Sequence, residues 1–103
     1  MNYWVQLIRK CIALLRSGVP IEQGRIDVWG QCYFDERIVI NIDLSDEDKV
    51  RTLLHECIHW LHPRWPEVVV LSMEKHAFAY LEHMDKEFGI FLFFLDTSDI
   101  LGG

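Results

Sequence analysis

The stretch Leu53-Leu54-His55-Glu56-Cys57-Ile58-His59-Trp60-Leu61 decides how the rest of this chain is arranged. It carries two histidines four residues apart, with a glutamate directly after the first, inside an otherwise apolar run. Residues four apart on an α-helix lie on one face, so His55 and His59 would point the same way. Glu56 would project beside them, and Cys57 would point away. The apolar neighbours predict a buried helix, which other elements of the chain must cover.

Two imidazoles with this spacing and an adjacent carboxylate form the HExxH pattern. Zinc binds imidazole nitrogen at about 2.0–2.1 Å, and a catalytic zinc ion keeps one position open for water. We therefore expect Zn²⁺ as cofactor, His55 and His59 as metal ligands, and Glu56 as the catalytic base. The alternative is a chance match on a core helix, and the apolar flanks favour the metal site over it.

Length, charge and cysteine usage limit what else the chain does. The 103 residues are enough for a single domain, residues 1–103, with one core. The net charge is −6 and the ten lysines and arginines are scattered, which argues against a nucleic-acid partner. Three widely spaced cysteines indicate reduced thiols rather than a disulfide framework. With no signal-peptide pattern and no membrane-spanning run, we expect a cytoplasmic protein without membrane partners.

The segments before the motif predict a helix and a hairpin. Residues 3–17 repeat apolar side chains at helical spacing and are followed by Gly18 and Pro20, which end a helix. Residues 25–34 and 37–42 are rich in β-branched and aromatic side chains and flank Asp35-Glu36, as in a β-hairpin. Gly30 suggests a bulge or a close backbone approach.

The motif helix has clear start and stop signals. Ser45 is a favourable N-cap and the acidic residues 46–48 suit the first turn, so the helix should begin at Asp46. His62-Pro63 should end it. The short link to residue 66 then requires a second helix, residues 67–88 capped by Gly89, to pack antiparallel on the first. The predicted fold class is α+β.

A catalytic zinc ion requires a third protein ligand. His62 lies about 10.5 Å along the helix axis from His55, which is too far for one ion. In an antiparallel pair, the level between His55 and His59 meets the second helix near residue 72, which favours Glu74. Glu74 also shares a face with apolar residues, and a buried carboxylate needs a cation. The alternative for Glu74 is an ion pair with Arg or Lys. Glu67 is expected to serve the helix dipole, while His76 and Glu82 fall on other faces.

The last segment, residues 90–103, opens with Ile-Phe-Leu-Phe-Phe-Leu. Such an apolar run would aggregate if it remained in water. We expect it to dock as an added strand or against an apolar groove, which completes the core or occupies the cleft.

The pattern resembles the gluzincin clan of zinc metallopeptidases, and the small size resembles the minimal members called minigluzincins. The resemblance covers residues 29–80 and includes Glu74-Lys75-His76-Ala77, which is similar to the ExxA pattern of the ligand glutamate in that clan. Many gluzincins carry an aspartate four residues after this glutamate to orient the first histidine, and here Phe78 stands in that place. Asp43 or a backbone carbonyl would then have to orient His55.

The resemblance implies zinc-dependent hydrolysis of peptide bonds. The substrate, a peptide or protein segment, would bind as an extended strand along residues 37–42 or their hairpin partner. It also implies a latent form, in which residues 90–95, with Asp96 and Asp99 beyond them, lie at the cleft. Candidate stabilisers of the developing negative charge are Tyr80, His83, His76 and Tyr33.

A second class of function stays open: a catalytically inactive zinc-binding scaffold that keeps the peptidase fold and binds a partner. Glu56 argues against it, because a structural zinc site needs no general base. The chain is expected to be a monomer or a weak homodimer.

Overall fold

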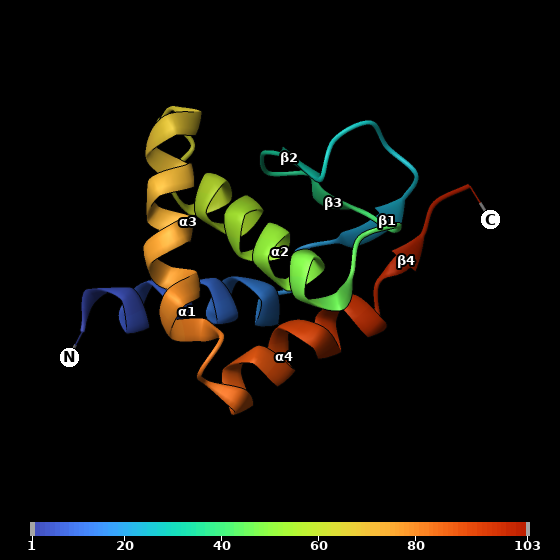
Figure 1. Ribbon diagram of the computed structural model, residues 1–103. Helices are drawn as coiled ribbons and strands as arrows, with labels where there is room; N and C mark the ends of the chain where they lie inside the picture. Colours follow the sequence, from blue (N-terminus) through green and yellow to red (C-terminus); the bar gives the residue numbers. More distant parts are fainter. Residues whose placement is uncertain (1, 103) are drawn as a thin grey trace.

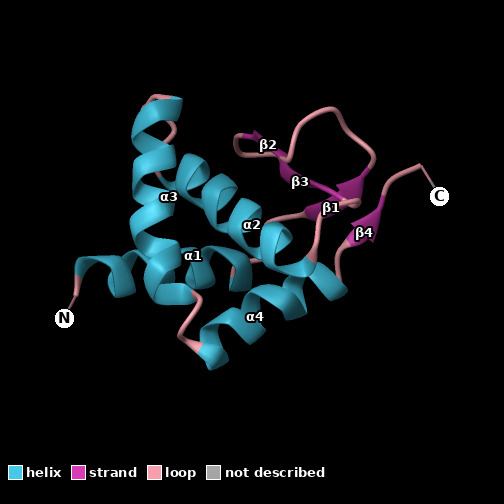
Figure 2. Ribbon diagram, viewed as in Figure 1, coloured by secondary structure: helices cyan, strands magenta, loops and turns pink. Residues whose placement is uncertain are grey.

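The computed structural model describes residues 2–102 and has an α+β architecture (Figures 1 and 2). In chain order the elements are α1 (Tyr3–Arg16), β1 (Ile21–Gly24), β2 (Gly30–Tyr33), β3 (Arg37–Asn41), α2 (Asp46–Leu61), α3 (Glu67–Leu81), α4 (Asp85–Asp96) and β4 (Asp99–Ile100). Helix α2 contacts α1, α3 and α4 as well as β2 and β3. The HExxH segment is therefore part of the central helix of the domain (Figure 1).

The N-terminal helix and its ends follow the sequence prediction. The Asn2 side chain caps α1 by accepting a hydrogen bond of 2.7 Å from the Trp4 backbone N–H. Gly18, just beyond the end of α1, has a φ of 96°, a left-handed conformation that glycine adopts without strain. The apolar face of α1 packs into the core through Leu7, Ile8, Cys11, Ile12 and Leu15. No helix among residues 2–102 combines the length and the apolar character needed to cross a membrane.

The sheet is mixed, with strand order β2-β3-β1-β4. The predicted hairpin is present: β2 and β3 run antiparallel, with Gly30 opposite Ile40 and Tyr33 opposite Arg37. Strand β2 is shorter than the predicted residues 25–34. Strand β1 was not predicted, because Ile21–Gly24 is short and half polar. It pairs parallel with β3, so β3 is internal and β2 forms one edge of the sheet.

Helix α2 begins and ends where the sequence indicates. Ser45 caps it by accepting a hydrogen bond of 3.2 Å from the Asp48 N–H, and the first turn is acidic. The last regular residue is Leu61, and His62 is the C-cap, directly before Pro63. Its core face is formed by residues that are fully buried, namely Val50, Leu53, Leu54, Cys57 and Ile58.

The prediction of one continuous helix over residues 67–88 is wrong. Helix α3 ends at Leu81, and α4 begins at Asp85 after a short turn in which the Met84 N–H bonds to the Leu81 carbonyl at 3.0 Å. The turn redirects the chain so that Phe91 and Leu95 are buried in the core beneath α1 and α2. Gly89, the predicted cap, therefore lies within α4.

The C-terminal segment completes the core and the sheet. Residues 90–95 belong to α4 rather than to a strand, and β4 pairs parallel with β1 through Asp99 and Ile100. This is the far edge of the sheet from β2. Of the two expectations for this segment, the structure has the one in which it completes the core.

Candidate metal centre and cleft

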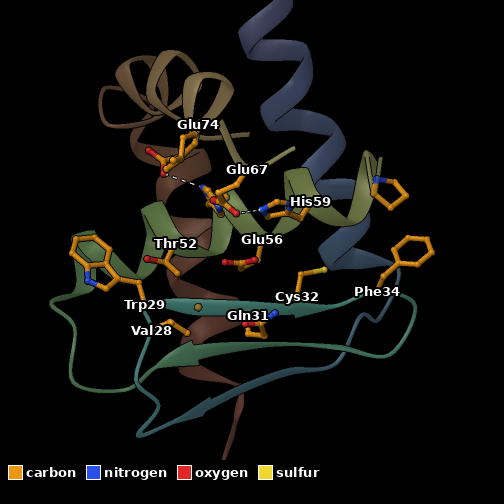
Figure 3. A pocket seen from close by; sticks show the side chains of 14 residues that line it. Val28, Trp29, Gln31, Cys32, Phe34, Thr52, Glu56, His59, Glu67 and Glu74 are labelled. Atoms are coloured by element: carbon orange, nitrogen blue, oxygen red, sulfur yellow. Dashed lines mark hydrogen bonds and ion pairs between the residues drawn. The ribbon is translucent and has the colours of Figure 1, made fainter. Parts of the chain in front are cut away.

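Helix α2 presents the motif residues toward a cleft between itself and β2 (Figure 3). His55 and Glu56 are buried, and His59 is half-buried. The centroids of the two imidazole rings are 4.9 Å apart, as expected for residues one helical turn apart on one face. The two rings are therefore positioned to act together at the cleft.

Glu67, the first residue of α3, joins the two histidines. Its Oε1 lies 2.6 Å from Nε2 of His55, and its Oε2 lies 2.9 Å from Nε2 of His59. The link between the helices is tight: the Trp65 N–H bonds to the His62 carbonyl at 3.1 Å, and the two rings of this pair stack at 3.7 Å. This turn carries the start of α3 back over the last turns of α2.

The donor set of His55, His59 and Glu67 fits a divalent metal ion. One donor atom from each residue lies within 4.8 Å of the others, which is close enough for one shared ion. Two imidazole nitrogens and one carboxylate oxygen are the protein ligands of a common class of catalytic zinc sites. The Glu67 side chain is 61% exposed, so the cluster opens to the cleft on that side.

Glu74 occupies the other side of the His55 ring. Its Oε1 lies 3.2 Å from Nδ1 of His55, and its Oε2 accepts a hydrogen bond of 2.6 Å from Nε of Arg51. Burial alone would raise the pKa of Glu74, but the hydrogen bonds from His55 and Arg51 lower it, so the carboxylate is charged. A charged carboxylate can accept the proton on Nδ1, and Nε2 of His55 would then be the nitrogen available to a metal ion.

The choice of Glu74 as third ligand thus differs from the cluster in the structure. Glu74 does lie beside His55, as its position along the second helix predicted. It contacts Nδ1 of the ring, however, whereas Glu67 contacts Nε2. The alternative considered for it, an ion pair with a basic residue, is present as Arg51. Phe78 replaces the expected acid, and its ring supports the Arg51 guanidinium at 5.2 Å. Asp43 pairs with Arg25 at the surface and does not orient His55.

Glu56 is a carboxylate in an unfavourable environment. Burial raises its pKa to about 7, the charges of Glu67 and Glu74 act in the same direction, and His55 opposes them. For His55 itself, burial would lower the pKa, but the hydrogen bond to Glu74 and the surrounding carboxylates raise it. Several carboxylates thus converge on a small volume, and a bound cation would reduce their repulsion.

Strand β2 forms the floor of the cleft and approaches α2 closely at Gly30. A Cβ added there would lie 2.5 Å from Cγ2 of Thr52 and 3.0 Å from Oε2 of Glu56, so only glycine fits without displacing them. Next along the strand, burial raises the pKa of the Cys32 thiol to about 11, and the charge of Glu56 adds to the shift. The sequence indicated a close approach at Gly30 but did not identify its partners.

The cleft has a volume of about 530 Å³. Its lining combines the motif with residues of β2, of the adjoining loops and of α3: Val28, Trp29, Gly30, Gln31, Cys32, Phe34, Thr52, His55, Glu56, His59, Pro63, Glu67, Leu71 and Glu74. No residue beyond Glu74 lines it, so the expected docking of the C-terminal segment in the cleft is not found among residues 2–102.

The remaining candidate residues lie elsewhere. His62 stacks on Trp65, and His76 stacks on Trp4 with ring centroids 5.0 Å apart. Among the other predicted stabilisers, the Tyr80 hydroxyl accepts a hydrogen bond from Asn2 and the ring of Tyr33 lies under Arg37. Glu82 and His83 pair with each other. None of these side chains lines the cleft.

The comparisons with known proteins give no relative. No family model, curated protein or solved structure matches this chain. The resemblance to gluzincins therefore stays a prediction, and functional inference rests on the site itself.

Proposed function

We propose that this protein is a zinc-dependent peptidase in which His55, His59 and Glu67 hold the metal and Glu56 is the general base. One observation carries the proposal: the Nε2 atoms of both motif histidines converge on one carboxylate at 2.6 and 2.9 Å, with Glu56 buried beside them in an open cleft. A purely structural site would close its fourth position with protein and would not need Glu56.

The chain contributes proton transfer, orientation and substrate alignment. Zinc, when bound, would polarise the substrate carbonyl and lower the pKa of water. Glu56 takes the proton from the attacking water and returns it to the leaving nitrogen. Glu74, held by Arg51, keeps the His55 ring in one orientation. Gly30 leaves Glu56 the room it requires.

The free edge of β2 supports peptide binding as an added strand. Strand β3 is internal, so of the two strands of the hairpin only β2 is available at this edge. The backbone N–H of Asn41 donates to the Trp29 carbonyl, on the β2 side of β3. The N–H of Ile38 donates to the Pro20 carbonyl, on the β1 side. Because backbone groups alternate in an antiparallel pair, the N–H and C=O of Gly30 and Cys32 point away from β3. Extended polypeptide is the ligand that such an edge pairs with.

Two measurements on the same preparations test the proposal. Zinc content is measured in the wild-type chain and in Glu56→Gln, and hydrolysis of an unstructured protein such as denatured casein is followed for both. We expect about one zinc ion per chain in each and cleavage only by the wild type. Glu82→Gln, a substitution of the same kind outside the cleft, should retain cleavage. Bound zinc without any Glu56-dependent cleavage would instead favour the inactive scaffold.

A further inference from the structure

We infer that the cleft selects extended peptide segments with large apolar side chains on both sides of the metal centre and disfavours acidic ones. The inference rests on the proposed function and adds the class of substrate. It is carried by the side chains at the two ends of β2, which take no part in the metal site.

Exposed apolar side chains flank the motif at both ends of the floor strand. Trp29 is 54% exposed and lies at the start of β2, while Phe34 is 57% exposed and lies at its end. Figure 3 shows them at opposite ends of the strand, with Glu56 between them. Exposed aromatic side chains of this size are unfavourable in water and are typical of binding surfaces.

Each aromatic side chain has apolar neighbours that widen its contact surface. Val28, beside Trp29, is 49% exposed and also lines the cleft. At the other end, the Phe34 and Trp60 rings lie 5.9 Å apart, and Pro63 lines the cleft on that side. The cleft therefore offers two apolar patches, which we call the Trp29 patch (Val28 and Trp29) and the Phe34 patch (Phe34, Trp60 and Pro63).

The distance between the patches sets the length of the segment. Strand β2 has four residues, and the two aromatic residues directly flank it. An added strand rises about 3.3 Å per residue, so a segment that reaches both patches has about six residues. Such a segment crosses the metal centre near its middle and places one end at each patch.

Charge matters at the two patches themselves. An aspartate or glutamate of the bound segment at either patch would lose hydration against apolar side chains, and no lysine or arginine among residues 2–102 lines the cleft to pair with it. The cleft therefore disfavours acidic side chains at both ends of the segment as well as selecting apolar ones.

Equilibrium binding of peptides to the zinc-loaded Glu56→Gln variant tests the inferred substrate preference, because a binding measurement does not depend on turnover. The probes are fluorescein-labelled ten-residue peptides with Phe or Leu toward both ends, and the same peptides with Ala or Asp at one or both of these positions. We expect affinity to fall roughly tenfold for each Ala and further for each Asp, in the range usual for apolar pockets. Equal affinity for all peptides would overturn the inference.

Substitutions in the cleft test whether each patch binds the apolar side chain at its own end of the peptide. Added to Glu56→Gln, Trp29→Ala and Phe34→Ala should each weaken binding of the apolar peptide about tenfold. Each should leave the affinity unchanged for the peptide that carries Ala at the corresponding end. Phe93→Ala is the matched control, since Phe93 is 59% exposed on α4 and does not line the cleft. All three side chains are exposed, and circular dichroism checks that the variants fold.

The same variants distinguish peptide selection by the two patches from self-association through them. Affinities that do not differ between the two cleft variants and Phe93→Ala would overturn the inference. A dimer that Trp29→Ala and Phe34→Ala dissociate without any change in peptide affinity would assign the patches to self-association and would also overturn it. Selective binding by a wild type that cleaves nothing would support the inference while refuting the peptidase proposal.

Discussion

Helix α3 carries two glutamates that face the same histidine and differ in almost every physical respect. Glu67, in the first turn, has a side chain that is 61% exposed, and its ionic partners among residues 2–102 are His55 and His59. Glu74, in the middle of the helix, is buried and holds Arg51. The buried carboxylate already has its cation, whereas the exposed one has both oxygens directed at imidazole nitrogens. If Glu67 is the third metal ligand, as proposed, burial is a poor guide to that ligand in this chain.

Removal of Glu67 should have the largest effect on metal binding. For Glu67→Ala we expect zinc affinity to fall roughly 1,000-fold, because one of three protein ligands is lost from a binding free energy on the order of 10–16 kcal/mol. Competition with a chromophoric chelator measures the affinity. Val68→Ala, at the next position and 72% exposed, is the control and should bind zinc like the wild type. A Glu67→Ala protein with wild-type affinity would reverse the assignment of the two glutamates.

A Cβ at Gly30 should impair catalysis without loss of metal. Gly30→Ala forces Thr52 and Glu56 to move, and a displacement of about 1 Å reduces a rate on the order of 100-fold. We expect kcat to fall by this factor and zinc content to stay unchanged. The control is Gly89→Ala in α4, where no atom lies within 4 Å of the added Cβ and helix propensity should raise the free energy of unfolding by about 0.5–1 kcal/mol. Full activity of Gly30→Ala would show that Glu56 does not depend on this contact.

Removal of Glu74 should weaken metal binding less than removal of Glu67. Glu74→Ala frees the His55 ring to rotate, and loss of such an orienting group lowers affinity about 10–100-fold. Glu74→Gln retains an acceptor for Nδ1 and should recover part of the loss. If Glu74→Ala lost zinc as completely as Glu67→Ala, Glu74 would be a ligand, as the sequence alone had suggested.

The substitution with the smallest expected effect changes the reactivity of Cys32, which faces Glu56 across the cleft, by a few-fold. A pKa of about 11 leaves the thiol neutral at pH 8, so iodoacetamide should modify it roughly 100-fold more slowly than an unperturbed thiol. The rate should rise about tenfold per pH unit until about pH 11. Glu56→Gln removes a negative charge and should accelerate the reaction a few-fold at pH 8. Peptide mapping distinguishes Cys32 from the buried Cys11 and Cys57.

Sequence signals that act locally predicted the fold well. The N-cap Ser45, the acidic first turn and the His62-Pro63 stop each depend on a few neighbouring residues, and α2 has the predicted bounds. The hairpin was recognised for the same reason. The break between α3 and α4 was missed, because no helix-breaking residue marks it in the sequence. The break allows Phe91 to be buried in the core, and that contact depends on tertiary packing. Strand β1 was missed because its parallel pairing with β3 depends on distant residues.

The site was predicted in part for a related reason. The i, i+4 spacing brought His55 and His59 together, and the level of Glu74 followed from helix geometry. The side of the imidazole that each carboxylate reaches depends on how the turn at residues 62–66 directs the start of α3, and composition does not reveal this. Arg51 is one turn before His55 on α2, on the same face of the helix. This spacing is the sequence signal that indicates Arg51 as the cation beside the buried Glu74.

The tight turn between α2 and α3 would make a bound metal ion part of the folding equilibrium. The proposed ligands come from both helices, so an ion that binds them would bind the folded chain in preference to the unfolded one. At a free zinc concentration of about 1,000 times its Kd, this linkage adds about 4 kcal/mol to the free energy of unfolding. Zinc supply would then set the fraction of chains that stay folded as well as the fraction that is loaded, and a chelator would lower the melting temperature.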